Sequence, residues 1–141
     1  MANLDGSCLC GSITYTCDAE PAAVAACHCT ECQKQTGTSF SVVVVVPRDA
    51  LAIDGESLGT FTTVGTDSGK EVARQFCRDC GSPIVSLPAA LPELALIKAG
   101  TLEDRSWLDP QMHVWCDSAQ PWIPLEDLAP TRLPRGVPAS A

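Results

Sequence analysis

The hydrophobic pattern of the chain consists of short apolar segments separated by turn-forming residues. Residues from Ser12 to Cys17 alternate and are rich in β-branched side chains, which predicts a strand. The run from Phe40 to Val46 is continuous and ends at Pro47, which predicts a strand buried on both faces. Further strands are expected at Leu51–Ile53, at Leu58–Val64 and Lys70–Phe76 as a hairpin, and at Ile84–Leu87, Leu94–Ala99 and Met112–Cys116.

Helical periodicity is almost absent, so the sequence predicts a mainly β domain. A turn of helix that starts near Cys32 is expected to end at Gly37, because glycine tolerates the left-handed conformation at a helix C-terminus. We expect a loop over Asp18–Ala26, a loop or one helical turn over Thr101–Pro110, and a single helical turn over Glu126–Leu128.

The length and composition of the chain fit one globular domain. With 141 residues and 45% hydrophobic side chains, it can bury a single core. We expect this domain over residues 1–133 and a disordered tail over residues 134–141, where proline and small residues show no apolar period. The longest apolar runs are far shorter than the ~20 residues that span a bilayer, and the first residues lack the features of a secretory signal. The sequence thus predicts a cytoplasmic protein that does not associate with a membrane.

The charge of the chain is acidic, with 17 Asp and Glu against nine Lys and Arg, a net charge of −8. No cluster of basic residues interrupts this acidic background, so a phosphate backbone would find no favourable surface. Nucleic acid is therefore excluded as an expected partner.

Cysteine is the residue type that points to chemistry. The chain has nine cysteines, an odd number that fits a disulfide framework badly. The cytosol keeps thiols reduced, so metal binding is the better explanation for so many of them. Cys17 shares a strand face with Ile13 and Tyr15, and we expect it to be a small buried hydrophobic residue instead of a ligand.

Two cysteine pairs are each followed by a glycine, Cys8/Cys10 by Gly11 and Cys77/Cys80 by Gly81. A turn of this kind presents both sulfurs to one ion, and two such turns together supply the four thiolates of a closed tetrahedral zinc site. Iron is a possible occupant of the same ligand set, although zinc is commoner. A redox pair of the thioredoxin type would need a βαβ setting, which the pattern does not predict.

The segment from Cys27 to Cys32 contains three further thiols, at Cys27, Cys29 and Cys32. Structural zinc sites use four protein ligands, whereas catalytic sites leave one position open for water or substrate. His28 or His113 could supply a fourth ligand and close this second site. With an open position instead, the metal would bind a substrate thiol as a thiolate and activate it as a nucleophile. The residues alone leave both alternatives open.

The three cysteine motifs, in this order, carry a resemblance to a known family. They are Cys8-Leu9-Cys10-Gly11, Cys27-His28-Cys29-Thr30-Glu31-Cys32 and Phe76-Cys77-Arg78-Asp79-Cys80-Gly81. The later segments Gly100-Thr101-Leu102, Met112-His113-Val114-Trp115 and Pro121-Trp122 extend the similarity over nearly the whole chain. The sequence resembles the glutathione-dependent formaldehyde-activating enzyme family, which includes centromere protein V.

This resemblance implies a β-tent fold of small antiparallel sheets held by zinc knuckles. It also implies a structural zinc at Cys8, Cys10, Cys77 and Cys80 and a second, catalytic zinc at Cys27, Cys29 and Cys32. The implied activity is that of a carbon–sulfur lyase, in which glutathione and formaldehyde give S-hydroxymethylglutathione. Glutathione's sulfur would meet the second zinc and attack the carbonyl carbon.

Three residues are candidates for contacts with such a substrate. Lys34 lies close to the metal-binding segment in sequence and could pair with a carboxylate of glutathione, with a solvated lysine as the alternative. Trp115 and Trp122 could line a pocket mouth or belong to the core. The competing functional hypothesis is a non-catalytic zinc-binding scaffold that binds a protein partner. The coordination of the second metal distinguishes the two functions.

Overall fold

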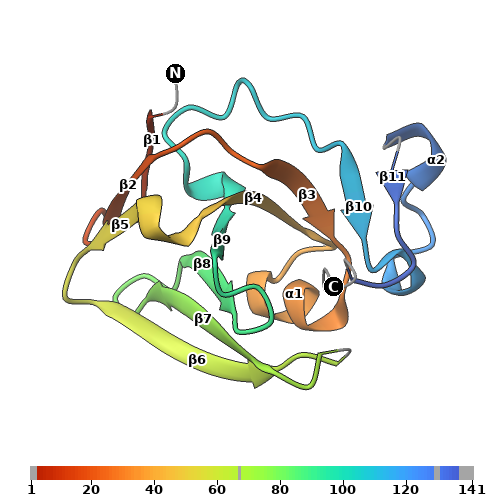
Figure 1. The fold of residues 1–141 in the computed structure, drawn as a ribbon, viewed down its shortest axis with the longest axis horizontal. Coiled ribbons are helices and arrows are strands. Elements are labelled where there is room, and N and C mark those ends of the chain that lie inside the picture. The colour runs from red at the N-terminus through yellow and green to blue at the C-terminus, as the bar shows by residue number, and fades with distance from the viewer. Residues whose placement is uncertain (1–2, 67, 129–130, 137–141) are drawn as a thin grey trace.

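The computed structural model of the protein describes residues 3–66, 68–128 and 131–136. Most of the elements are short strands (Figure 1). They are β1 Asn3–Ser7, β2 Thr14–Asp18, β3 Ala23–Cys27, β4 Ser41–Pro47, β5 Leu51–Asp54, β6 Leu58–Val64, β7 Glu71–Cys77, β8 Pro83–Pro88, β9 Leu94–Lys98, β10 Met112–Val114 and β11 Thr131–Arg132. The helices are α1 Thr30–Thr36 and α2 Leu125–Leu128, and the 3-10 turns are η1 Arg48–Ala50, η2 Ala99–Thr101 and η3 Cys116–Ser118.

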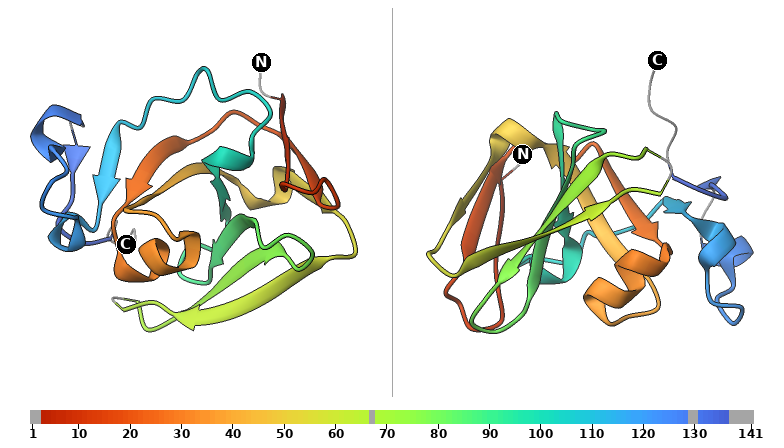
Figure 2. Two further views of the ribbon diagram at one scale, coloured as in Figure 1. Left: turned by 180° about the vertical axis from the view of Figure 1, so that it is seen from behind. Right: turned by 90° about the horizontal axis from the view of Figure 1, so that it is seen from below.

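The described strands form two sheets, which confirms the expected mainly β fold of the tent type. The small sheet has the order β1-β2-β5, and the large sheet has the order β11-β10-β3-β4-β9-β8-β7-β6. The pairs in the large sheet are antiparallel except that β10 runs parallel to both β3 and β11. The long connection between η2 and β10 carries the chain across the molecule, which allows this parallel pairing (Figure 1). The C-terminal elements lie at the end of the molecule opposite the small sheet (Figure 2).

Most strands lie where the hydrophobic pattern predicts them, and β6 and β7 form the expected hairpin. The expected loop over Asp18–Ala26 is wrong, because it contains most of β3. Alanine has a weak preference for strands, so the Ala-rich sequence of β3 gives little local signal. The strand forms because β4 and β10 supply hydrogen-bond partners on both of its edges. The hydrophobic pattern also does not predict β1 or β11.

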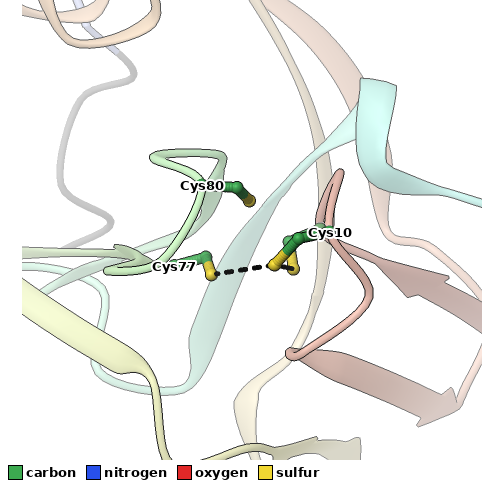
Figure 3. A group of neighbouring side chains, drawn as sticks. Cys10, Cys77 and Cys80 are labelled. Carbon is green, nitrogen blue, oxygen red and sulfur yellow. Dashed lines mark hydrogen bonds between the residues drawn. The ribbon is translucent and has the colours of Figure 1, made fainter.

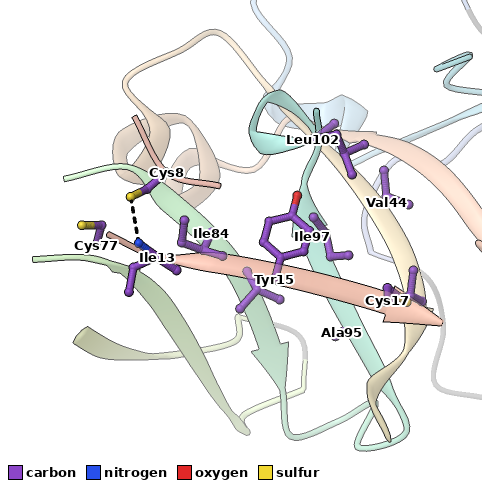
Figure 4. Packing of buried hydrophobic residues seen from close by; sticks show 13 residues of the cluster. Cys8, Ile13, Tyr15, Cys17, Val44, Cys77, Ile84, Ala95, Ile97 and Leu102 are labelled. Atoms are coloured by element: carbon purple, nitrogen blue, oxygen red, sulfur yellow. Dashed lines mark hydrogen bonds between the residues drawn. The ribbon is translucent and has the colours of Figure 1, made fainter. Parts of the chain in front are cut away.

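The hydrophobic core lies between the small sheet and one face of the large sheet (Figure 4). Ile13, which directly precedes β2, and Tyr15 of β2 lie in one cluster with Val44 of β4 and Ile97 of β9. All four side chains are buried. Cys17 is buried in the same cluster, as expected for a small hydrophobic residue. The apolar area buried in this core contributes to the stability of the domain.

Tyr15 ties the core to the turn that follows β9. Its hydroxyl lies 2.7 Å from Thr101 Oγ1, and a side chain at Gly6 would collide with this phenol and with the carbonyl of Thr101. Burial, with smaller contributions from the carboxylates of Asp5 and Glu103, raises the pKa of Tyr15 to about 12.

We expect Tyr15 to make the domain less stable as the pH rises from 10 to 12. The folded chain retains the phenolic proton in this range while the unfolded chain releases it, so the contribution is complete below pH 10 and lost through pH 12. A shift of this size corresponds to at most about 3 kcal/mol. Urea unfolding at several alkaline pH values should show this decline in the wild-type protein and a shallower one in Tyr15→Phe. Parallel pH profiles for the two proteins would contradict the assignment.

The C-terminal segment continues along the edge of the large sheet. Arg135 accepts a hydrogen bond at its carbonyl from Trp115, and its guanidinium lies 4.8 Å from the centre of the Trp115 ring. The tail expected from Pro134 onward thus begins in contact with the domain, and residues 137–141 lie outside the described residues. None of the helices in the described ranges is long and apolar enough to cross a membrane.

Candidate metal centres

The first cysteine group joins two distant parts of the chain. Cys8 and Cys10 lie in the turn between β1 and β2, and Cys77 and Cys80 lie at the turn between β7 and β8. All four sulfurs lie within 4.8 Å of one another, with 3.8 Å between those of Cys10 and Cys77 (Figure 3). The structure therefore brings together the four thiols that the sequence spacing grouped. Four thiols at these separations suit a tetrahedral zinc ion.

Serine hydroxyls surround this four-cysteine group. Ser12 Oγ lies 3.1 Å from Cys10 Sγ and 3.2 Å from Cys77 Sγ. Hydrogen bonds from Ser12 and Ser57 lower the pKa of Cys77 to about 5, and Ser82 is the main cause of a Cys80 pKa of about 7. Cys77 and Cys80 are thus the two members of the group that most favour the thiolate form, which binds a metal ion.

The second cysteine group lies where β3 passes into α1. Cys27 ends β3, Cys29 is the N-cap of α1, and Cys32 lies in the first turn of that helix. The Cys29 sulfur accepts a hydrogen bond of 3.2 Å from the Cys32 amide. The helix ends at Gly37 in the left-handed conformation, as the sequence predicts. This short strand-to-helix turn brings the three sulfurs within 4.8 Å of one another.

The three thiols of this second group differ in their protonation. Interactions with Cys29 and Cys32, together with burial, raise the pKa of Cys27. Hydrogen bonds from Cys27 and Cys29 lower the pKa of Cys32 to about 2, and the positive charges of Lys98 and Arg74 contribute to that decrease. Of the three thiols, Cys32 therefore most favours the thiolate form.

The two histidines pair with each other and do not belong to either cysteine group. His28 Nε2 lies 2.9 Å from His113 Nδ1, and both rings are buried beside Phe40. His113 is therefore a hydrogen-bonded histidine of the interior and does not supply a fourth ligand to the second group. Among the described residues, no His, Asp or Glu ligand atom joins the three sulfurs of Cys27, Cys29 and Cys32.

Two buried cations beside the second group were missed by sequence reasoning. Arg74 of β7 donates to Cys32 Sγ at 3.9 Å and to Glu31 Oε1 at 3.2 Å. Lys98 of β9 donates to Ser41 Oγ at 3.0 Å. Each of the two cations is only 5% exposed. The available signal was a single charge within an otherwise apolar strand pattern, at Arg74 between Val72 and Phe76 and at Lys98 in the run Leu94–Ala99.

The remaining candidate residues lie at the surface or near it. Lys34 is exposed in the last turn of α1. Trp122 is largely exposed, and Trp115 is half-buried with a left-handed backbone at φ 58°. Two surface clefts of about 750 and 840 Å³ have no cysteine in their walls, so neither of them is the site of the cysteine chemistry.

The fold and the site define a small β-tent protein with two cysteine groups suited to metal ions. The sequence model of the family described as "Glutathione-dependent formaldehyde-activating enzyme" matches residues 3–118. The chain belongs to this family, as the cysteine motifs indicated.

Fungal relatives of this chain have names that assign this activity to them provisionally. A Podospora anserina protein named as a glutathione-dependent formaldehyde-activating enzyme is 30% identical, covering 79% of this chain and 53% of its own length. An Aspergillus terreus protein with the same name is 31% identical, covering 77% of this chain and 57% of its own length. The chain thus spans about half the length of these curated relatives.

A solved structure has the same fold. The crystal structure of a Rhodobacter sphaeroides protein superposes with a TM-score of 0.58 at 20% identity, covering 92% of this chain and 98% of that one. At this identity the similarity concerns the fold alone.

Proposed function

We propose that the chain is a zinc-dependent carbon–sulfur lyase that forms S-hydroxymethylglutathione from glutathione and formaldehyde. One zinc ion would be held by Cys8, Cys10, Cys77 and Cys80 as a structural ion, and a second by Cys27, Cys29 and Cys32. Membership of the family supports the activity, and the three-thiol ligand set supports an open position on the second ion. A reducing compartment such as the cytoplasm suits the nine free thiols of the described chain.

The observation that carries this proposal is the group of three sulfurs that lacks a fourth protein ligand among the described residues. The two histidines that could have closed the site are hydrogen-bonded to each other. Cys27 and Cys29 are half-buried, so this group borders the solvent. These features favour an enzyme over a scaffold in which both ions are purely structural.

In the proposed reaction, a bound zinc ion would supply the positive charge that converts a substrate thiol into a thiolate. Cys27, Cys29 and Cys32 would supply the three ligand sulfurs. Arg74 and Lys98 place positive charge beside these sulfurs. The addition forms one S–C bond, the C=O π electrons move to oxygen, and the proton of the thiol ends on that oxygen. Exposed Lys34 is our candidate for pairing with a carboxylate of glutathione.

Native mass spectrometry of the zinc-loaded chain tests this proposal. We expect two zinc ions per chain and a glutathione adduct that depends on the second ion. The matched control is S-methylglutathione, which keeps both carboxylates and the peptide but cannot become a thiolate. It should bind about tenfold or more weakly than glutathione, because it loses the charged sulfur contact with the metal.

The protein should also accelerate hydroxymethylglutathione formation above the spontaneous rate, measured by NMR exchange spectroscopy. If the chain binds two zinc ions but forms no glutathione adduct and gives no acceleration, the proposed enzymatic function is contradicted and a non-catalytic scaffold is supported.

A further inference from the structure

The two faces of the large sheet differ in chemistry. Val44 and Ile97 point toward the small sheet and belong to the core. Their direct neighbours along each strand, such as Val43 on β4 and Lys98 on β9, point to the other face, because side chains alternate along a strand. Residues that pair directly across two strands share a face, and the register pairs Cys27 with Ser41 and Val43 with Lys98.

The same register continues across the remaining strands. Ser86 of β8 pairs with Leu96 on one side and with Arg74 on the other. Leu96 and Lys98 lie two residues apart on β9, so Ser86 and Lys98 are diagonal neighbours within reach of a long side chain. Cys27, Ser41, Lys98, Ser86 and Arg74 therefore form a polar row along one face. Helix α1 follows Cys27 at one end of the row and is contacted by Arg74 from the other end (Figure 1).

Two groups in this polar row have unused hydrogen-bonding capacity. The Lys98 ammonium has three N–H donors, and its hydrogen-bond partner among the described residues is Ser41 Oγ. Ser86 Oγ is buried and has no hydrogen-bond partner in the described part of the chain. An unpaired buried hydroxyl and a buried ammonium are both costly unless a further group binds to them.

The burial of the row restricts what that group can be. Ser41, Ser86, Arg74 and Lys98 are all buried, with at most 5% of each residue exposed. The terminal carboxylates of a peptide such as glutathione would need to leave solvent completely to reach them. A small molecule with one polar oxygen fits this environment better, and positive charge favours an oxygen that becomes negative.

We infer that Lys98 and Ser86 form an oxyanion site that binds the carbonyl oxygen of the aldehyde beside the three-cysteine group. This inference rests on the proposed function. As the thiolate sulfur bonds to the carbonyl carbon, the C=O π pair moves to oxygen. Lys98 and Ser86 donate hydrogen bonds to that oxygen until it takes the proton that the thiol released. Arg74 is bound to Glu31 and Cys32, so it is a positioning residue that holds α1 against the row.

Formate is a suitable probe, because it is a one-carbon molecule with a negatively charged oxygen. We expect the zinc-loaded chain to bind formate in a saturable manner, measured by calorimetry against a chloride background. Lys98→Met keeps the length of the side chain and should weaken formate binding about tenfold or more. Ser86→Ala removes only the unpaired hydroxyl and should weaken it about threefold. Lys70→Met, at an exposed lysine in the β6–β7 turn, is the matched control and should bind as wild type does.

Zinc content and circular dichroism of each variant test whether the fold and both metal sites persist. If Lys98→Met does not fold, Ser86→Ala alone decides the question. The inference is overturned if wild type does not bind formate, or if the folded variants bind it as well as wild type. Formate binding without a glutathione adduct supports the oxyanion site and contradicts the proposed function. A glutathione adduct without formate binding supports the proposed function and contradicts the oxyanion site.

Discussion

Cys80→Ser should prevent the domain from folding stably, whereas Cys29→Ser should lose one zinc ion and keep the fold. Cys80 belongs to the group that joins segments as far apart as Cys10 and Cys77, which are separated by 67 residues. The binding energy of such a structural zinc, roughly 10–16 kcal/mol in small metal-dependent domains, becomes folding energy. That is as large as the whole stability of a typical domain, roughly 5–15 kcal/mol.

Cys29 belongs instead to a group that lies within one strand-to-helix turn, so its metal closes no long loop. Serine is also a good N-cap, and it should preserve the hydrogen bond to the Cys32 amide that caps α1. Circular dichroism, thermal unfolding and zinc content measure the difference between the two variants. If both lose structure to the same extent, the division into a structural and a chemical metal site is wrong.

Ile97→Ala should lower the free energy of unfolding by about 2–5 kcal/mol, the range for deleting a large buried aliphatic side chain. Ile97 is 1% exposed in β9, at the centre of the cluster between the two sheets (Figure 4). A truncation there removes apolar contacts and leaves a cavity that rigid strands on both sides cannot fill. Urea unfolding of the zinc-loaded protein measures the loss.

Val64→Ala is the matched control, since Val64 is an aliphatic residue that is 59% exposed at the end of β6. Its substitution should change stability by about 0.5 kcal/mol or less. Both variants should still bind two zinc ions. A loss below about 1 kcal/mol in Ile97→Ala would mean that the metal ions, and not the core, stabilise this fold.

The fold could be predicted from the sequence wherever the strand pattern is local. The valine run of β4 and the alternation of β7 predict their strands because the side chains themselves prefer extended backbone. β3 could not be predicted in this way, since its alanines gain their stability from two neighbouring strands that are distant in sequence. The parallel pairing of β10 also depends on the path of the chain and not on its local composition.

The cysteine groups could be anticipated from spacing, because a metal-binding turn needs its thiols only a few residues apart. The structure brings together the same seven cysteines. The polar row of Lys98, Ser86 and Arg74 could not be anticipated, because it depends on the register across three strands. One residue of slippage in that register would turn these side chains toward the core.

The large sheet separates the residues that keep the protein folded from those proposed to react. Cys8 and Cys77 belong to the core cluster, while Cys27, Lys98 and Ser86 lie on the opposite face. Substitutions on the polar face should therefore alter substrate preference, whereas substitutions in the core cluster should mainly lower the melting temperature. Such a division makes the domain a suitable scaffold for directed evolution, with randomisation confined to the face that carries the polar row and α1.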